Sequence, residues 1–542
     1  MATKTSRVYV TQLTGGANSS IASSLIDEKE ASDLLNIRWT NAGIVNKRDG
    51  FRDWGVELTD PRWIGKVQGP TPQILAMDGT TLKKTTDGIW SAVTVSGGVT
   101  FSSSAEQYSG TQVSKTKTVI WNGVDAGRVY DGMNVSNNGM MPSAQFSAIY
   151  KGYQWASGVS TQGPRVYIST FADPTDFTNS TAATTDGEDP DNATSVPGAT
   201  VFTGTVPDVA QFVDISPDDG EPVTGLFLYQ DYLIIAKTHS LWSCTFDATT
   251  LKPVIQLISR AAGCIAFGSG VNVKNDLYCL SDQGVITIGN EKNYVSATLR
   301  HNLLSEKIYE LLLGINEAAV KRATATFWDH MYILSVPQGS STTNNRVFMI
   351  DTRFGGWAIW DNIDARCFLT YTPADDETKL YFLSEGQTSV REMVKGYYYD
   401  GADAIIAYWR SKAIDAGALD ITKRWTYFTL FMRNIGHSAK VSIQTEVETL
   451  EPVNIFEGTN TGIGFRQWGT GSWLGFVSEV GGGTETALST SDEAWRTQPN
   501  MEGRTFMFEV RNDQPGENFY LAGYAAAYQS LKAYYFDQSR TF

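Results

Sequence analysis

The amino-acid sequence predicts an all-β protein: an irregular β-propeller of six or seven blades, with an additional β-sandwich platform built from C-terminal and N-terminal segments. Three observations predict this fold. Short apolar strands recur in pairs, and the pairs fall about 40 to 50 residues apart, the span of a four-stranded blade. The composition, with 12% aromatic and 19% charged residues and 50 glycines, is typical of a turn-rich β protein. Past Lys395 this paired pattern stops.

These patterns divide the chain into three segments. Residues 1–61 form an N-terminal platform segment, residues 62–394 form the propeller, and residues 395–542 form the C-terminal β-sandwich. A loop insertion at 171–223 is rich in Asp, Thr, Pro and Gly, so we expect it to project from the propeller or contact another subunit. An irregular assembly of β-sandwiches is the alternative architecture.

The N-terminal segment contains the spacing of a capping box. Asp27 and Glu30, three residues apart, precede Ala31, Leu34 and Leu35, and this predicts a short helix. Two strands follow it, on either side of a turn at Gly43.

The clearest propeller unit is the hairpin predicted at 274–289. Short apolar strands flank the turn at 281–284, where Gly284 can take the positive φ that a tight connection requires. A second feature, at 303–322, has apolar residues at three- and four-residue spacing and predicts an amphipathic helix. Its polar face mixes Glu and Lys, so we expect it to pack on the propeller and not on a membrane.

Beyond the propeller, five β runs at 405–409, 425–431, 440–444, 506–510 and 520–524 predict the C-terminal sandwich, with a loop-rich region at 451–500. No run approaches eighteen apolar residues, so no membrane-spanning segment is predicted. The four cysteines show no CxxC spacing and are predicted to be buried thiols.

The formal net charge of −15 argues against a protein that grips nucleic acid through its phosphates, because such binding requires clusters of Lys and Arg. An acidic wall would instead suit a channel through which DNA passes without binding to the wall. The alternative is that the charge maintains solubility.

Patterns typical of catalysis are missing from the sequence. The four histidines are unpaired, and there is no P-loop, nucleophile elbow or dinucleotide fingerprint. The acidic loop at 186–191 lacks the twelve-residue ligand spacing of a calcium site. We therefore expect no enzyme activity, no metal and no cofactor.

Several pieces of the sequence, in chain order, carry a resemblance. They are GGAN (15–18), EASDLLNIRWTNAGIVNKRDGF (30–51), FADPTDFT (171–178), SPDDGEPVTGL (216–226), DYLIIAKTHSLW (231–242), GCIAFGSGV (263–271), NDLYCLSDQGVITIG (275–289) and YWRSKAIDAGALDITKRW (408–425). Together these resemble the tail-tube nozzle and packaged-DNA stabilisation proteins of short-tailed bacteriophages.

The resemblance implies a structural virion protein that forms a ring with itself, usually a hexamer, below the portal and adaptor. Such a ring extends the tail channel, retains packaged double-stranded DNA and lets it pass at ejection without specific binding. Distal needle, fibre or spike proteins would be further partners. The implied location is the virion tail, after synthesis in the host cytoplasm.

Two groups of candidate residues follow from this resemblance. Candidate contacts with the adaptor or a neighbouring subunit are Asn36, Arg38, Lys47 and Arg48. Candidate residues of a channel or tip loop are Asp186, Glu188, Asp189 and Asp191.

A host-glycan-binding or glycan-cleaving propeller of the tail is the alternative function. Propeller glycosidases place Arg, Asp, Glu and Tyr on central loops, and Arg165, Arg260 and Arg366 fall near predicted blade ends. Arginines and acids gathered in one central pocket would favour this alternative. Acidic residues lining a wide axis shared by several subunits would favour the ring.

Overall fold

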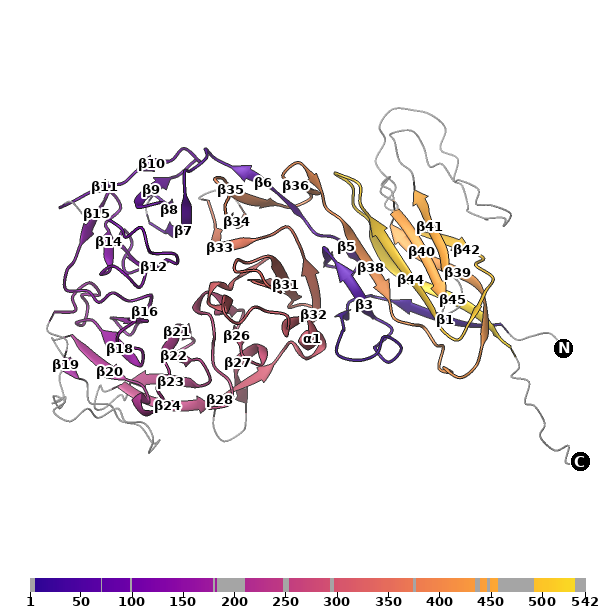
Figure 1. Cartoon of the computed structure of the whole chain (residues 1–542), viewed down its shortest axis with the longest axis horizontal. Helices are drawn as coiled ribbons and strands as arrows, with labels where there is room; N and C mark the ends of the chain where they lie inside the picture. The colour runs from indigo at the N-terminus through magenta and orange to yellow at the C-terminus, as the bar shows by residue number, and fades with distance from the viewer. Residues whose placement is uncertain are drawn as a thin grey trace, which may run out of the picture.

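The computed structural model describes residues 5–69, 71–97, 100–178, 181–182, 210–246, 253–292, 297–373, 377–433, 439–445, 449–456 and 492–531. Figure 1 shows a ring of small sheets beside a second, elongated β domain that contains the first and last strands, β1 (Ser6–Thr11) and β45 (Tyr520–Ser530). The predicted propeller with a β-sandwich platform is therefore confirmed.

Seven sheets surround the propeller axis within the described residues, and we number them as blades in chain order. Blade 1 contains β7 (Pro61–Val67), β8 (Gln73–Asp78), β9 (Thr81–Thr85) and β10 (Ser91–Ala92). Blade 2 contains β11 (Thr94–Val95), β12 (Ser109–Gln112), β13 (Thr118–Trp121), β14 (Arg128–Tyr130) and β15 (Asn134–Asn137). Blade 3 contains β16 (Phe146–Tyr150), β17 (Tyr153–Ser157), β18 (Arg165–Ile168), β19 (Thr181–Ala182) and β20 (Gln211–Asp214).

Blades 4 to 7 follow the same plan. Blade 4 contains β21 (Val223–Tyr229), β22 (Tyr232–Lys237), β23 (Leu241–Phe246) and β24 (Pro253–Ser259), and blade 5 contains β25 (Val271–Val273), β26 (Asp276–Ser281), β27 (Gly284–Lys292) and β28 (Ala297–Leu303). Blade 6 contains β29 (Thr324–Trp328), β30 (Met331–Val336), β31 (Arg346–Asp351) and β32 (Gly356–Trp360), and blade 7 contains β33 (Ala365–Tyr371), β34 (Lys379–Ser384) and β35 (Val390–Val394). The inner strands β7, β12, β16, β21, β25, β29 and β33 contact one another in sequence, and β33 contacts β7, which closes the ring.

The outer strand of blade 7 comes from the N-terminal segment. β6 (Gly50–Trp54) pairs antiparallel with β35, and β36 (Tyr399–Asp400) and β37 (Asp403–Ala404) extend the same sheet. Phe51 of β6 is buried, and its ring packs edge-on against that of Phe382, with the two ring centroids 5.3 Å apart. The last blade therefore combines strands from both ends of the propeller sequence, and β6 lies before the boundary drawn at residue 61.

The hairpin predicted at 274–289 is confirmed. β26 and β27 pair antiparallel from Leu277 opposite Ile288 to Ser281 opposite Gly284, and Gly284 takes a φ of 123°. The apolar side chains face two neighbouring blades. Leu277, Cys279 and Ile286 pack with residues of blade 4, and Leu280 and Val285 belong to the cluster that includes blade 6. Burial between blades is what a single hairpin cannot achieve.

Both predicted helices need correction. The segment after Asp27 is a strand, β3 (Glu30–Leu35), because β2 (Gly16–Ala17) and β38 (Ala407–Ser411) pair with it on its two sides. The capping hydrogen bond still forms, since the Asp27 N–H donates to Glu30 Oε2 at 3.0 Å.

The helix predicted at 303–322 shortens to η3 (Glu306–Ile308), α1 (Tyr309–Leu312) and η4 (Val320–Arg322). It ends early because Asn316 N–H donates to the Pro337 carbonyl at 2.9 Å and Ile315 bridges Gln338. Ile308 and Leu312 are buried against the propeller core, as expected for the apolar face. The other 3-10 turns are η1 (Pro217–Asp219) and η2 (Phe267–Ser269).

The platform consists of two packed sheets. One contains β1 (Ser6–Thr11), β4 (Ile37–Trp39), β5 (Val45–Lys47), β39 (Lys423–Arg433), β42 (Asp492–Thr497), β43 (Met501–Gly503) and β45 (Tyr520–Ser530). The other contains β38, β40 (Ala439–Thr445), β41 (Thr449–Phe456) and β44 (Phe506–Asn512). Their facing aromatic side chains, including Trp409, Phe428, Phe508 and Tyr524, form the platform core.

The propeller and the platform share one sheet. Blade 6 continues from β32 through β2 and β3 into β38, β44, β40 and β41, so ten strands run without interruption from one unit into the other. One hydrophobic cluster likewise extends from Val285 of blade 5 and Tyr332 of blade 6 to Trp409 and Tyr524 of the platform. Among the described residues, no helix has the length and apolar character needed to cross a bilayer.

Candidate functional site: the junction and the axial pocket

The four N-terminal candidate residues lie together at the junction between propeller and platform. Arg48 is completely buried and forms a bidentate pair with Asp400, with Nη1 to Oδ1 at 2.9 Å and Nη2 to Oδ2 at 2.6 Å. Its Nε donates to Asn36 Oδ1 at 2.8 Å, and Asn36 Nδ2 in turn donates to Asp361. Arg48 thus joins the N-terminal segment to the loop after blade 6 and to the outer strands of blade 7.

Lys47, next to Arg48, points into the platform. Its buried Nζ donates to Asn512 Oδ1 at 2.7 Å, to the Gln514 carbonyl at 3.1 Å and to the Glu517 carbonyl at 3.0 Å. Burial lowers the pKa of Lys47 to about 8, although Glu517 opposes this shift. Two consecutive residues, Lys47 at the end of β5 and Arg48 in the turn after it, therefore anchor the platform and the propeller.

Arg38 adds a third connection at this junction. It forms ion pairs with Asp49 and, at 2.6 Å, with Asp329 of blade 6, and Lys395 lies 3.4 Å from the same carboxylate. Burial alone would raise the pKa of Asp329, but the two cations lower it below its usual value.

These contacts change the role assigned to the four residues. Asn36, Lys47 and Arg48 are buried, Arg38 is largely covered, and each side chain has partners within its own chain. We therefore assign Asn36, Arg38, Lys47 and Arg48 to the junction and not to an adaptor or subunit contact surface. Asp186, Glu188, Asp189 and Asp191 lie outside the described residues.

Two glycines make the junction possible. A Cβ on Gly16, which has a φ of 75°, would lie 2.2 Å from the Trp357 nitrogen of blade 6. A Cβ on Gly50 would lie 1.9 Å from the Tyr399 carbonyl oxygen. Only glycine permits the backbones to approach this closely.

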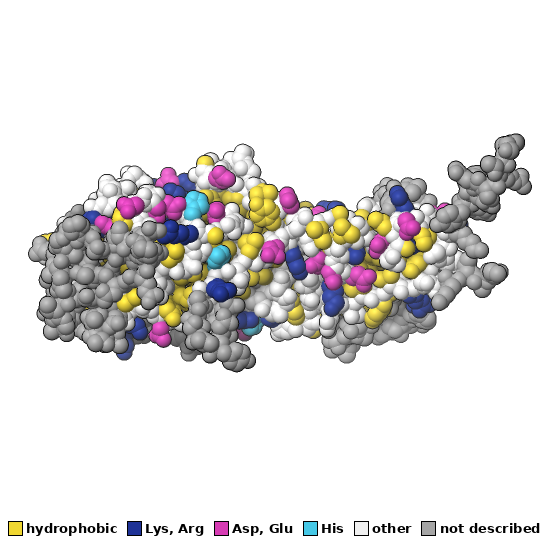
Figure 2. Space-filling view, turned by 90° about the horizontal axis from the view of Figure 1, so that it is seen from below, with side chains coloured by type: hydrophobic (Ala, Val, Ile, Leu, Met, Phe, Trp, Pro, Cys, Tyr) yellow, Lys and Arg dark blue, Asp and Glu magenta, His cyan; other side chains and the backbone are white. Residues whose placement is uncertain are grey.

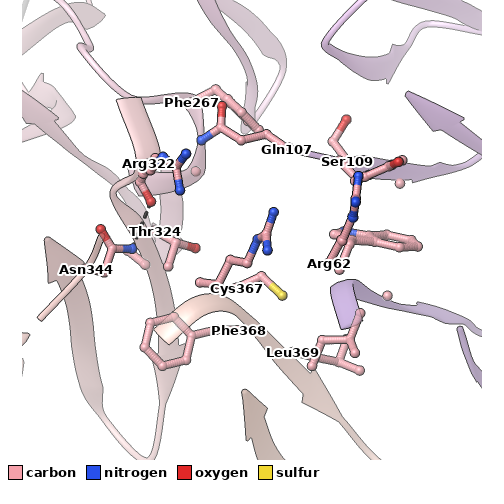
Figure 3. A pocket seen from close by; sticks show the side chains of 18 of the residues that line it. Arg62, Gln107, Ser109, Phe267, Arg322, Thr324, Asn344, Cys367, Phe368 and Leu369 are labelled. Atoms are coloured by element: carbon pink, nitrogen blue, oxygen red, sulfur yellow. Dashed lines mark hydrogen bonds between the residues drawn. The ribbon is translucent and has the colours of Figure 1, made fainter. Parts of the chain in front are cut away.

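A cavity of about 390 Å³ lies between the inner strands of blades 1, 2, 6 and 7. Strands β7, β12, β29 and β33 and the turn η2 contribute to its wall. Trp63, Phe267, Phe368 and Leu369 form apolar parts of the lining. The Trp63 indole lies against Gly65 and Gly110, where a Cβ would approach it within 2.3 and 2.7 Å. We call this cavity the axial pocket (Figure 3).

Three arginines line the axial pocket, and Figure 3 shows Arg62 and Arg322 on opposite sides of it. Arg62 Nη1 donates to the carbonyls of Ser103 and Ala105 at 2.7 and 3.0 Å, which fixes its guanidinium at the pocket wall. Arg366 Nη2 donates to the Glu106 carbonyl at 2.6 Å.

Acidic side chains partly balance these arginines. Glu106 pairs with Arg322, while Glu385 lies 3.6 Å from Arg366 and 4.0 Å from Arg322. Glu106 is largely exposed, so its pair with Arg322 is a rim contact that solvent weakens. Burial raises the pKa of Asp364, a third acid in the lining.

Other polar groups of the pocket are held by backbone atoms. Asn344 Nδ2 donates to the carbonyls of Arg322 and Ala365 at 2.8 and 2.7 Å, which fixes the amide orientation. The buried Asn344 Oδ1 has no hydrogen-bond partner in the structure. Burial raises the pKa of the Cys367 thiol to about 11, so this thiol stays protonated at neutral pH and is a poor nucleophile.

Of the arginines singled out from the sequence, Arg366 lines the axial pocket, whereas Arg165 pairs with Asp214 at 2.7 Å within blade 3. Arg260 is not among the lining residues. Sequence reasoning missed Arg62 and Arg322. One signal could have linked these residues to the pocket. Arg62, Arg322 and Arg366 all lie at or just before the start of an inner strand.

No family model matches this chain, and no curated protein matches it. Similar solved structures include PorZ, a surface component of the type-IX secretion system of Porphyromonas gingivalis (12% identity, 74% of this chain and 46% of that chain, TM-score 0.31). A second is the extracellular domain of a putative hybrid two-component system from B. thetaiotaomicron (7% identity, 79% of this chain and 58% of that chain, TM-score 0.37). A third is an exo-β-1,3-galactanase from Phanerochaete chrysosporium (10% identity, 88% of this chain and 100% of that chain, TM-score 0.25). The chain spans about half the length of the first two, at 46% and 58%. These similarities concern the fold alone.

Proposed function

We propose that this protein is a structural subunit of the tail nozzle of a short-tailed bacteriophage. In this proposal copies of the chain form a ring, with the sixfold symmetry that the resemblance implies, below the portal and adaptor. The ring extends the tail channel, retains packaged DNA and lets it pass at ejection. The observation that carries the proposal is the continuous connection of propeller and platform through one ten-stranded sheet.

A rigid connection suits a protein whose task is to hold its place in a column of stacked rings. Domains of one chain move relative to one another unless their interface is large and hydrophobic. Here a continuous sheet, a shared hydrophobic cluster and the buried pair of Arg48 with Asp400 all cross the junction. The two units are thus expected to behave as one body.

The sequence pieces that resemble nozzle proteins also support the proposal, because several of them fall on this junction. Gly16 lies in the first piece, and Lys47, Arg48 and Gly50 lie in the second. Lys423, in the last piece, is buried and donates to the Ile421 and Arg504 carbonyls at 3.0 and 3.1 Å. The resembling pieces therefore include residues that fix the geometry of the subunit.

The surface charge suits a conduit for DNA. The net charge is −15, and Figure 2 shows a face on which acidic and basic side chains are interspersed without a continuous basic stripe. Tight binding of DNA would require such a stripe. We expect no catalytic activity in this role.

The outer face of the platform is our candidate for the contact between subunits. Tyr9 on β1 and Tyr427 on β39 lie on the two strands that flank β45, and their side chains are 64% and 43% exposed. Phe431 packs edge-on against Tyr9 at 5.3 Å. Exposed aromatic side chains of this kind are enriched at protein interfaces.

The test is the assembly state of the full chain, measured by native mass and electron microscopy, alone and with a purified portal–adaptor complex. We expect closed rings that join the adaptor end of the complex. A chain that stays monomeric and fails to join the complex would contradict the proposal.

The axial pocket favours a second candidate function, the binding of a glycan by the propeller. Arginines and acids gather in one central pocket of a single chain, which is the arrangement set out above as favouring that alternative. Binding of a host glycan is compatible with a place in a tail.

A further inference from the structure

We propose that the axial pocket binds a carboxylated saccharide, such as one or two uronate units, through Arg322 and Arg366. The inference names the ligand class of the second candidate function and does not depend on ring formation, because a single chain supplies the described wall of the pocket.

The size and lining of the pocket suit a small polar ligand. A cavity of about 390 Å³ lies within the range of small-molecule sites. Its wall combines apolar side chains, among them Trp63 and Phe368, with guanidinium groups. Sugar rings present both C–H faces and hydroxyl groups, so they match a wall of this mixed kind.

The arginines select an anionic group on that ligand. A planar guanidinium matches a carboxylate with two parallel hydrogen bonds. Arg322 and Arg366 approach the pocket from adjacent blades and share Glu385, at 4.0 and 3.6 Å, so a ligand carboxylate could lie within reach of both. Arg62 lies on the opposite side, where Asp60 pairs with its guanidinium at 2.9 Å.

The charges around the pocket are balanced, although the whole chain carries a net charge of −15. The lining holds the cations Arg62, Lys66, Arg322 and Arg366 and the acids Glu106, Asp364 and Glu385, and Asp60 pairs with Arg62 at 2.9 Å. Glu106 is 65% exposed, so a ligand carboxylate can displace it from Arg322 at small cost.

The same acids favour a carboxylated sugar over a phosphate. Glu385 and Glu106 would repel a dianionic phosphate more strongly than a monoanionic carboxylate. The carboxylate oxygens of Glu385 and Glu106 also offer acceptors for donors such as sugar hydroxyls. A sugar acid uses both the cationic and the acceptor groups of the lining.

The experiment is a calorimetric titration of the full chain with a glucuronate disaccharide, its methyl ester and inorganic phosphate. The ester keeps the sugar shape and removes the charge. We expect the acid to bind at least about tenfold more tightly than the ester or phosphate. Equal binding of acid and ester, tighter binding of phosphate, or no heat with the acid would overturn the proposal.

Two pocket variants with opposite expected effects test the assignment. Arg366→Gln should weaken binding of the acid about 10- to 100-fold, whereas Glu106→Gln should strengthen it about two- to fivefold by freeing Arg322. Arg424→Gln, which removes an exposed arginine that pairs with Glu502 on the platform, is the matched control and should leave binding unchanged.

The thermal unfolding midpoint of each variant confirms its fold. If Arg366→Gln and Arg424→Gln bind the acid equally well, or if Glu106→Gln weakens binding, the pocket assignment is wrong. If the chain forms rings but does not bind the uronate, the nozzle proposal stands and the pocket proposal fails. If the chain binds the uronate but does not form rings, the pocket proposal stands and the nozzle proposal fails.

Discussion

Arg48 and Asp400 lie 352 residues apart in the chain and form a bidentate ion pair that is almost completely shielded from solvent. The arginine comes from the turn between β5 and β6, and the aspartate from the strand that follows blade 7. A buried pair of this kind fixes the path of both segments at the junction.

Breaking this pair should destabilise the whole subunit. Arg48→Met or Asp400→Asn leaves a buried group without its partner, and we expect a loss of about 3–5 kcal/mol in the free energy of unfolding. Denaturant unfolding measures this loss. Arg424→Gln removes an exposed pair and should cost at most about 1 kcal/mol. A variant Asp400→Asn as stable as Arg424→Gln would refute the role of the pair.

Gly50→Ala should be destabilising because its Cβ would collide with the Tyr399 carbonyl at 1.9 Å. We expect a loss of at least about 1–3 kcal/mol, typical of overpacking. Gly139→Ala is the matched control, since its Cβ would meet nothing within 4 Å. Thermal unfolding of the two variants checks the prediction, and equal midpoints would count against the close approach at residue 50.

Lys47 should make stability depend on pH in the alkaline range. Its folded pKa of about 8 lies below the ordinary value of 10.5, so between these values the unfolded chain binds more protons than the folded chain. Stability from this group should therefore rise as pH increases through 8, by about 1.4 kcal/mol per unit.

The comparison between the protein and Lys47→Met isolates this effect, because other titrating groups are common to both. Urea unfolding from pH 7 to 9.5 should show a steeper rise for the unmodified protein. Parallel slopes would contradict the depressed pKa.

The strand β6 should be required for a closed propeller. A fragment of residues 62–394 lacks the outer strand of blade 7 and exposes the edge of β35, whereas a fragment of residues 50–404 retains it. We expect the longer fragment to unfold at a higher temperature and to aggregate less. Circular dichroism and light scattering test this, and indistinguishable fragments would show that β6 is dispensable.

Charge on the outer face of the platform should disrupt ring assembly. Tyr427→Asp places a carboxylate in the proposed subunit contact, and burying it there without a partner is costly. We expect native mass to shift from rings toward monomers. Ile89→Asp changes a side chain that is 67% exposed on the propeller and should assemble normally. Equal assembly of both variants would exclude this face as the contact.

Much of the propeller could be predicted because its signals are local. The hairpin at 274–289 depends on alternating apolar residues and a turn ending in Gly284, all within sixteen residues. The axial pocket could not be predicted, because Arg62, Arg322 and Arg366 converge only when blade 7 closes against blade 1. Their shared position at the start of inner strands is visible in the sequence only once the strands are known.

Periodicity and turn residues over short distances were enough to predict the β class, the blade hairpins and the start of a second unit after Lys395. Tertiary structure alone decided that the segment after Asp27 is a strand, because β2 and β38 provide the backbone partners that a helix would have supplied internally. It also decided that Lys47 and Arg48 face inward to join the two units, because partners far along the chain, Asn512 and Asp400, balance the cost of burying them.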